Sequence, residues 1–463
     1  MAEPLAEKCA AYADRYDMLP APGETALCAV SGGADSVCLL LILLEIAETR
    51  GFRVACAHYD HRLRERSAAD AEFVRALCDR WNVPFYLGGG DMRAAAERAG
   101  KGLEETARAL RYEFLHRTAD EIGAKRLATA HTADDNAETA LLFLARGAGS
   151  RGLAGIAPRR GALVRPLLCA ERREIEAYLT GRGEHWVTDE SNFSADFARN
   201  RVRMEATPAL RSVNAAFARH VLEAGERLRE DEEYLRSLAL DFLEKHAEET
   251  PDGLRLPLRE TAALPKPVFC RALREICGEA LQAVHVEAAR ALLDARSGGA
   301  ADLPGERLTR SFDELYFTPR GGAPALPERE LPPNGEIVVP EAGLRLRRTD
   351  GAVCPESGPA DKRFTELWFR SPLPAGTLAV RARREGDRLR LWGRGCSKSL
   401  KKLFAEARIP AFRRARTPVL AVGDEVLAVP GLAAEESRLA RPGEMAIRIE
   451  IQKIYDTGDN RQL

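Results

Sequence analysis

The chain has 463 residues, more than one ordinary hydrophobic core accommodates, so we expect several domains. Hydrophobic residues make up 45% and charged residues 30%, which is typical of a globular protein and excludes a fibrous or disordered chain. The 69 basic residues nearly balance the 70 acidic ones, so there is no overall basic bias toward nucleic acid. Local basic patches can still bind phosphates, because salt screens each charge beyond roughly 10 Å.

Neither a membrane segment nor a metal-binding cysteine pair is indicated. The first twenty residues lack the apolar core of a signal peptide, and the longest apolar run, VCLLLILLEIA at 37–47, is too short to cross a bilayer. The ten cysteines include no C-x-x-C pair, which excludes a zinc ribbon or a redox dithiol. We therefore expect a cytoplasmic protein with free thiols and no membrane partner.

Strands and helices are predicted to alternate through residues 1–212. The expected strands are 25–30, 53–60, 83–89 and 125–130, and the expected helices are 37–51, 67–82, 103–123 and 134–147. This alternation predicts an α/β domain with a parallel sheet covered on both faces. Ligands of such sheets bind at the carboxyl ends of the strands, which here carry polar residues: 31–36, 58–61 and 131–135.

Three further segments complete the predicted organisation. Residues 210–296 show helical periodicity, and 213–330 is predicted to be a helical middle domain. Pro- and Gly-rich stretches follow from residue 297, and 331–372 is predicted to be a linker region. Residues 373–463 predict a small C-terminal α/β domain. Within it we expect a strand pair at 378–391, a basic helix at 398–409 and a hairpin at 418–431 with Gly423–Asp424 at its turn.

The stretch SGGADS at 31–36 has the form of a phosphate-binding turn. Its two glycines let backbone N–H groups approach an anion, and the helix that follows adds its positive end. The stretch lacks the Lys of a Walker A loop and the third Gly of the dinucleotide fingerprint. A plain turn, with Ser36 as a helix N-cap, is the alternative.

This loop resembles the SGGxDS loop of the PP-loop ATP pyrophosphatases, which have a HUP-like fold. Four further stretches are similar, in the same order, to motifs of the tRNA(Ile)-lysidine synthetase branch: residues 57–74, 102–112, 128–156 and 186–203. Two departures are Tyr59, where a small aliphatic residue is common, and Arg62, where Gly is common. The thiolase branch handles sulfur with cysteine pairs, and the absence of such pairs argues against it.

The resemblance implies an activity and its substrates. The enzyme would be a ligase that joins free L-lysine to C2 of the wobble cytidine of tRNA(Ile) with a CAU anticodon. ATP, with Mg²⁺, would first adenylate the cytidine and release pyrophosphate, and the product would be lysidine. The partners implied are the tRNA and lysine, and a homodimer is compatible with the sequence. The alternatives are another PP-loop tRNA-modifying enzyme, such as a thiolase, and a non-catalytic nucleotide- and RNA-binding module.

The motifs and the resemblance together assign roles to individual residues. The expected catalytic residues are Asp35, Arg108, His131, Asp135 and Glu138. ATP binding is assigned to Ser31, Gly32, Gly33, Ala34, Asp35, Ser36 and His58, with Asp35 and Asp135 as candidate Mg²⁺ ligands. Binding of lysine or cytidine is assigned to Asp134, Glu138, Arg111, Arg201 and Arg203. Asp134 and Glu138 would share one helix face, at spacing i, i+4.

Each of these assignments has a structural alternative. His58 and His61 could support the sheet, and Arg108 could form a salt bridge with Glu104 or Glu105. Acidic residues also favour a helix N-terminus for dipole reasons alone. The RNRVR stretch, with Arg199, Arg201 and Arg203 at alternate positions, could be a solvated basic strand.

The stretch 394–416 is the basic patch that the overall charge conceals. It holds one acidic residue, Glu406, and resembles part of the C-terminal tRNA-binding domain of longer lysidine synthetases. Phosphate contacts there would position a tRNA without reading its bases. The residues assigned to tRNA binding are Lys398, Lys401, Lys402, Arg413, Arg414 and Arg416. A solvated charged face is the alternative.

Overall fold

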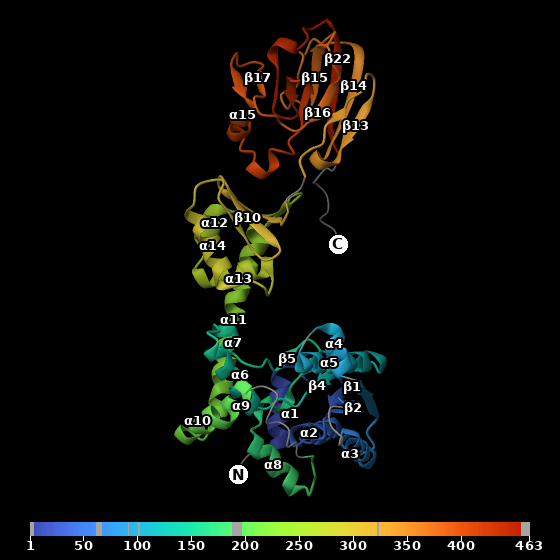
Figure 1. Ribbon diagram of the computed structural model, residues 1–463, viewed down its shortest axis with the longest axis vertical. Coiled ribbons are helices and arrows are strands. Elements are labelled where there is room, and N and C mark those ends of the chain that lie inside the picture. The colour runs from blue at the N-terminus through green and yellow to red at the C-terminus, as the bar shows by residue number, and fades with distance from the viewer. Residues whose placement is uncertain are drawn as a thin grey trace. The chain divides into compact units, whose positions relative to one another are not determined.

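A computed structural model describes residues 4–61, 67–90, 92–100, 102–187, 197–321 and 324–454. The chain divides into two compact units, residues 1–234 and 235–463, and each is described by itself (Figure 1). Arg62 and residues 188–196 of the motif at 186–203 lie outside the described residues. Among the described helices, none is both long and apolar enough to cross a membrane.

A six-stranded sheet forms the centre of the first unit. In spatial order its strands are β3 (Phe85–Gly89), β2 (Arg53–Asp60), β1 (Thr25–Ala29), β4 (Arg126–Ala128), β6 (Leu163–Val164) and β5 (Arg159–Arg160). The pairings among β3, β2, β1, β4 and β6 are parallel, and β5 runs antiparallel to β6. The predicted parallel sheet is therefore confirmed.

Helices cover both faces of this sheet, as Figure 1 shows. Those of the first unit are α1 (Leu5–Arg15), α2 (Ala34–Arg50), α3 (Ser67–Arg80), α4 (Met92–Ala99), α5 (Leu103–Glu121), α6 (Ala133–Ala145), α7 (Ser150–Leu153), α8 (Arg172–Gly181), α9 (Phe197–Arg201) and α10 (Thr207–Val213). In β1, Ala26 and Cys28 pack with α1, α2, α3 and α8, whereas Leu27 packs with α5. Strands buried on both faces need continuous apolar sequence, which TALCA provides.

The first unit ends later in the chain than the domain boundary expected at residue 212. Helix α11 (Phe217–His246) begins after that point, yet its first turns pack on the first unit. Ala218 packs against Ala133 and Ala137 of α6, and Leu222 joins the main core. A Cβ at Gly225 would lie 2.7 Å from the Ala154 carbonyl oxygen, so the missing side chain allows this close approach. The unit therefore extends to Tyr234.

The second unit starts with helices and a sheet. Its helices are the end of α11, α12 (Leu258–Ala262), α13 (Lys266–Cys277) and α14 (Ala283–Asp294). The antiparallel sheet contains β7 (Glu248–Thr250), β8 (Gly253–Pro257), β11 (Glu314–Pro319), β10 (Glu306–Ser311) and β9 (Ala300–Asp302) in spatial order. The segment 213–330 thus has the expected helices and, in addition, five strands. Strands β7 and β8 are three and five residues long, too short to interrupt the helical pattern clearly, whereas β9, β10 and β11 follow it.

Two packed sheets form the main part of the rest of the second unit. One contains β12 (Arg329–Glu330), β16 (Leu378–Arg381), β19 (Val419–Val422), β20 (Glu425–Val429) and β21 (Ala433–Ala434). The other contains β13 (Glu336–Val339), β14 (Leu344–Val353), β22 (Met445–Lys453) and β15 (Glu366–Arg370). Leu346 and Ile449 of the second sheet share a core with Val380 and Leu420 of the first, which makes this region a sandwich.

This region differs from the sequence-based expectation in two places. The segment 331–372, expected to be a linker, carries three strands. Its longest strand, β14, pairs with β22, which lies about a hundred residues later. A pairing over such a separation leaves no signal in the local composition. The strands expected to pair within 378–391 have other partners: β16 pairs with β12 and β19, and β17 (Arg388–Arg390) pairs with β18 (Ser397–Ser399). The hairpin β19–β20 and the helix α15 (Leu400–Glu406) are as predicted.

Candidate active site

The SGGADS loop connects β1 to α2 and presents a helix N-terminus. Gly32 has φ +95°, which side chains other than glycine rarely adopt. Gly33 is the N-cap of α2, and no described side chain caps that helix. The first N–H groups of α2 therefore have no side-chain cap among the described residues, and uncapped N–H groups of this kind can bind phosphate.

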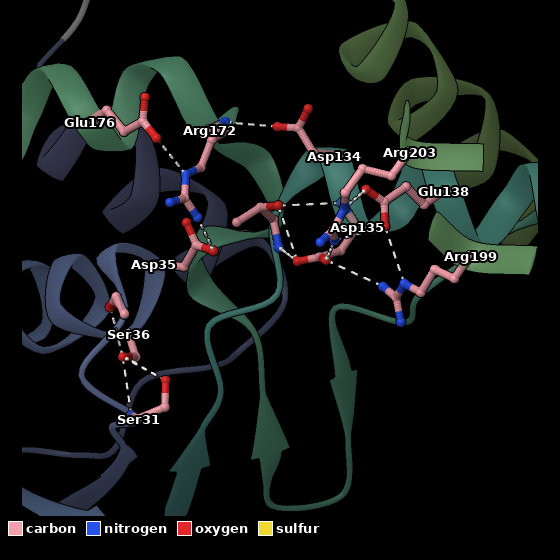
Figure 2. Close-up of polar contacts among 12 residues, drawn as sticks. Ser31, Asp35, Ser36, Asp134, Asp135, Glu138, Arg172, Glu176, Arg199 and Arg203 are labelled. Atoms are coloured by element: carbon pink, nitrogen blue, oxygen red, sulfur yellow. Dashed lines mark hydrogen bonds and ion pairs between the residues drawn. The ribbon is translucent and has the colours of Figure 1, made fainter. Parts of the chain in front are cut away.

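Ser36 stabilises the loop rather than capping the helix. Its hydroxyl donates a hydrogen bond to the Gly33 carbonyl at 2.9 Å and accepts one from the Ser31 N–H at 3.1 Å. The two hydroxyl groups of Ser31 and Ser36 lie 3.2 Å apart (Figure 2). Ser36 is the third residue of α2, so it is not the N-cap that the alternative interpretation proposed. Its hydroxyl instead connects Ser31 to Gly33 within the loop.

Asp35 is the carboxylate nearest this turn. Arg172, at the start of α8, donates a hydrogen bond to its Oδ2 at 2.8 Å and a second one to Glu176 at 2.8 Å (Figure 2). The Oδ1 of Asp35 is buried and receives no hydrogen bond from the described residues. Burial, opposed by Arg172, raises the pKa of Asp35 from 3.8 to about 6.

The three carboxylates of α6 fall into two groups, not the single face expected. Asp134 points toward α8 and accepts a hydrogen bond from the Arg172 N–H at 2.7 Å, and it also pairs with Arg211 of α10. Asp135 and Glu138 instead share Arg199, at 3.2 and 3.1 Å (Figure 2). The spacing i, i+3, rather than i, i+4, therefore brings two carboxylates together.

Arg203 completes the second group. It makes a bidentate contact with Glu138, at 2.6 and 3.0 Å, and lies 3.6 Å from Asp135. The Glu138 side chain is only 4% exposed, so this carboxylate depends on its two arginines for charge balance. The other oxygen of Asp135 accepts hydrogen bonds from the N–H and hydroxyl of Thr132, in a capping box at the start of α6.

His131 lies just before α6 in a positively charged setting. Burial first, and then the charges of Arg165, Arg108, Arg111 and Arg199, together lower its pKa from 6.5 to about 3. The ring is therefore neutral at physiological pH, and its Nδ1 lies 3.1 Å from the Thr129 hydroxyl. It can exchange hydrogen bonds in the site but carries no charge there.

The remaining predicted residues of the first unit make mainly structural contacts. His58 is buried and its Nδ1 lies 2.8 Å from the Val30 carbonyl oxygen, so it ties β2 to the end of β1. Arg108 and Arg111 both lie over the ring of Tyr112, at 5.2 and 5.4 Å. Arg201 is exposed and lies 3.7 Å from Glu205, on the side of its helix away from the carboxylates. The Glu104 side chain, named above as a partner for Arg108, is outside the described residues.

The predicted tRNA-binding residues of the second unit divide into two sets. Arg413 and Arg416 both pair with Asp252, and Arg416 also donates a hydrogen bond to the Glu341 carbonyl at 3.1 Å. Arg414 donates to the Ile409 carbonyl at 3.0 Å. By contrast, the remaining three belong to or adjoin α15: Lys398 pairs with Glu406, and Lys401 and Lys402 are exposed.

Two arginines at the centre of the site, Arg172 and Arg211, were not predicted from the sequence. Arg172 carries a usable signal: it stands in the first turn of α8, where the helix dipole disfavours a cation. A cation at that position indicates an acidic partner elsewhere in the fold. Arg211 has no such signal, because it reaches Asp134 only through the folding of α10 against α6.

The described residues could supply one carboxylate ligand to Mg²⁺ rather than a complete set of protein ligands. Among the described residues, no group of three or more His, Cys, Asp or Glu side chains could hold a metal ion. Mg²⁺ is usually held by one or two carboxylates together with substrate phosphates. Asp35 fits this role, because its buried Oδ1 has no partner among the described residues and it adjoins the phosphate-binding turn. Asp135 fits less well, because both its oxygens are engaged.

The parallel sheet, the glycine turn and the uncapped N-terminus of α2 define a PP-loop nucleotide-binding protein. Residues 5–210 match the family model of the PP-loop domain, and residues 378–451 match that of the TilS substrate C-terminal domain. The chain is 34% identical to a tRNA(Ile)-lysidine synthase of Geobacter sulfurreducens, over 92% of this chain and 93% of the relative. It is 35% identical to one of Symbiobacterium thermophilum, over 97% and 98%.

A solved structure described as the crystal structure of a TILS C-terminal domain is also similar. It is 32% identical, covers 28% of this chain and 98% of its own, and has a TM-score of 0.24. From the matches over nearly the whole chain, the chain belongs to the tRNA(Ile)-lysidine synthase family. It is a ligase that uses ATP, and the resemblance seen in the sequence is confirmed.

Proposed function

We propose that this enzyme joins free L-lysine to C2 of the wobble cytidine of tRNA(Ile) with a CAU anticodon, through an adenylated cytidine, and so forms lysidine. The observation that carries the proposal is one juxtaposition. An anion-binding helix N-terminus at Gly33 is linked through Asp35 and Arg172 to the carboxylates and arginines of α6, α9 and α10. A nucleotide site and a site for a charged amino acid thus adjoin each other.

In the first step, the C2 oxygen of cytidine attacks the α-phosphorus of ATP and pyrophosphate leaves. The N–H groups at the start of α2 and the hydrogen-bonded Ser31 and Ser36 bind the leaving pyrophosphate. Asp35 would hold Mg²⁺, which neutralises phosphate charge when bound. His131, neutral and close to several arginines, contributes hydrogen bonds without adding positive charge.

In the second step, the lysine ε-amine attacks C2 and AMP leaves with the C2 oxygen. Only the neutral amine is a nucleophile, so one proton must be removed, and Asp135 or Glu138 accepts it. The same carboxylates attract the ammonium group of the incoming lysine. Arg199 and Arg203, which balance these carboxylates in the structure, supply fork-shaped donors for the lysine carboxylate or the cytidine. Arg108 is assigned to phosphate or the cytidine, and Arg111 to lysine or the cytidine.

We assign tRNA binding to the C-terminal region, with Lys398, Lys401 and Lys402 nearest the RNA. The domain plan expected from the sequence assigns 1–212 to catalysis and 373–463 to tRNA binding. A homodimer stays a prediction.

Labelled lysine provides the direct test. The chain is incubated with ATP, radiolabelled lysine and a tRNA(Ile) transcript bearing CAU, and label should appear in the RNA. Omitting lysine and supplying ATP labelled at the α-phosphate should leave label on the RNA as the adenylated intermediate. A transcript whose wobble cytidine is replaced by uridine is the control and should take up neither label.

Two results would contradict the proposal. Label that enters RNA only from a sulfur donor would make the enzyme a thiolase. Pyrophosphate release that depends on a small molecule, with no label in RNA, would indicate another substrate of the PP-loop class.

A further inference from the structure

The second unit contains a small cavity that the proposed chemistry does not use. Its volume is about 180 Å³, below the range of roughly 300–1,000 Å³ typical of pockets for drug-sized ligands. Its lining is mostly apolar and includes Phe364, Leu391, Trp392 and Leu403. Two charged residues, Arg394 and Glu406, also line it. It therefore has room for one ring system with a polar edge.

Two aromatic residues form part of the wall of this cavity. The rings of Phe364 and Trp392 meet edge to face, with centroids 6.1 Å apart and planes at 87°. Phe364 has φ +50°, an uncommon conformation for a bulky residue. Hydrogen bonds of 3.1 Å hold it there, one from its N–H to the Asp361 carbonyl and one from the Gly431 N–H to its own carbonyl. Strain of this kind is concentrated at ligand sites, because the surrounding structure must maintain it.

Charged groups gather at the same cavity. The Glu406 carboxylate accepts a hydrogen bond from Lys398 at 2.6 Å. Lys398, Lys402 and Arg394 together lower the pKa of Glu406, so the carboxylate stays ionised among several cations. Arg394 and Lys402 are exposed. The cavity thus offers an aromatic wall, one hydrogen-bond acceptor and surrounding cations.

We propose that this cavity binds one unpaired nucleobase of the tRNA, and this proposal rests on the proposed function. Unpaired bases in RNA are recognised by stacking on aromatic side chains and by hydrogen bonds at their edges. Glu406 can accept from an exocyclic amino group, and the surrounding cations can contact the flanking phosphates. Such an amino group is present on cytosine, adenine and guanine but not on uracil.

The base would come from the single-stranded 3′ end of the tRNA. The anticodon loop is assigned to the catalytic site, and the bases of the other loops of a folded tRNA are largely stacked on one another. The 3′ end is the remaining unpaired segment, and its bases are free to enter a cavity.

The first test removes the stacking surface. Trp392→Leu should raise the Kd of the full chain for tRNA(Ile) about tenfold, whereas Trp392→Phe, which keeps an aromatic ring, should stay within about threefold. The salt dependence should not change, because no phosphate contact is lost. Trp81→Leu, at a tryptophan that is 41% exposed in the first unit, is the matched control and should bind as the wild type does. Equal losses in Trp392→Leu and Trp392→Phe, or no loss in either, would overturn the proposal.

The second test uses a transcript that lacks the unpaired 3′ nucleotides. The wild type should bind it about tenfold more weakly than the intact tRNA, whereas Trp392→Leu should lose nothing further. If Trp392→Leu fails to fold, the wild-type comparison decides, and equal affinity for both transcripts would overturn the proposal. Lysine transfer by the wild type is measured separately. If the wild type transfers no lysine but the binding differences appear as expected, only the proposed function is rejected.

Discussion

At the scale of single residues, Asp35 shows how function opposes stability. Its carboxylate is mostly removed from water, has one arginine partner and lies near the acidic groups of Asp134 and Asp135. Burial therefore raises its pKa, and keeping it ionised at neutral pH destabilises the fold. For function, this places the carboxylate oxygen Oδ1, which has no partner among the described residues, beside the phosphate-binding turn.

Asp35→Asn should therefore abolish pyrophosphate release and yet stabilise the protein at alkaline pH. Folding raises the pKa of Asp35 from 3.8 to about 6, so protonated Asp35 favours the folded state. This contribution to the free energy of unfolding is complete below about pH 3.8 and is lost as the pH rises through 6. At pH 8 the variant should gain up to about 3 kcal/mol in free energy of unfolding, and at pH 4 much less. Urea unfolding at both pH values measures this.

The control for Asp35→Asn is Asp120→Asn, at an exposed position of α5. It should give the same small difference from the wild type at both pH values. An Asp35→Asn variant that is less stable than the wild type at pH 8 would show that the carboxylate contributes more through Arg172 than it loses by burial.

At the scale of elements, the segment around RNRVR shows why backbone geometry matters. In a strand, Arg199, Arg201 and Arg203 would share one face, as their alternate positions suggest. In the structure, α9 continues through a π-helical turn at Val202–Ala206 into α10. Helical spacing places Arg199 and Arg203 together on Glu138 and directs Arg201 away toward Glu205. Such π turns are frequent at functional sites.

Arg203→Lys and Arg201→Lys form a matched pair of variants. Lysine keeps the charge but not the fork that spans both oxygens of Glu138, so Arg203→Lys should lower kcat/KM for lysine at least tenfold. Arg201→Lys should stay within about twofold, because Arg201 is exposed on the opposite side. Steady-state lysine transfer measures both. Equal losses in the two variants would mean that the segment rearranges when substrates bind.

At the scale of the whole molecule, the charge of the chain conceals different uses of its arginines and lysines. The net charge is −1, yet the stretch 394–416 is strongly basic. Part of that basic charge is structural: Asp252, nearly buried, pairs with both Arg413 and Arg416. Lys401 and Lys402 are exposed on α15 and form no ion pair among the described residues, so they can meet phosphates directly.

The salt dependence of tRNA binding should separate these two sets. Lys401→Glu with Lys402→Glu should weaken binding and reduce the slope of log K against log salt by about 2. Arg413→Gln with Arg416→Gln should leave the slope unchanged and instead destabilise the second unit by about 3 kcal/mol, because Asp252 loses both partners. Filter binding at several salt concentrations and thermal unfolding measure the two effects. A slope that changes only in the arginine variant would reverse the assignment.

Much of the first unit could be predicted because its signals are local. The order of strands and helices, the glycine turn at 31–36 and the family motifs each depend on residues close together in the sequence. The same holds for the hairpin at Gly423–Asp424, where a turn sits between two apolar runs. Sequence by itself therefore determined the parallel-sheet class, the place of the nucleotide turn and the family.

Only the tertiary structure decided which charges meet. Arg172 and Asp35 are 137 positions apart, and Arg416 and Asp252 are 164 apart, so no periodic pattern relates them. For the same reason the segment 331–372 resembled a linker, although its strand β14 pairs with the distant β22. Ion pairs and sheet partners of this kind arise from packing between distant elements, and local propensity carries no information about that packing.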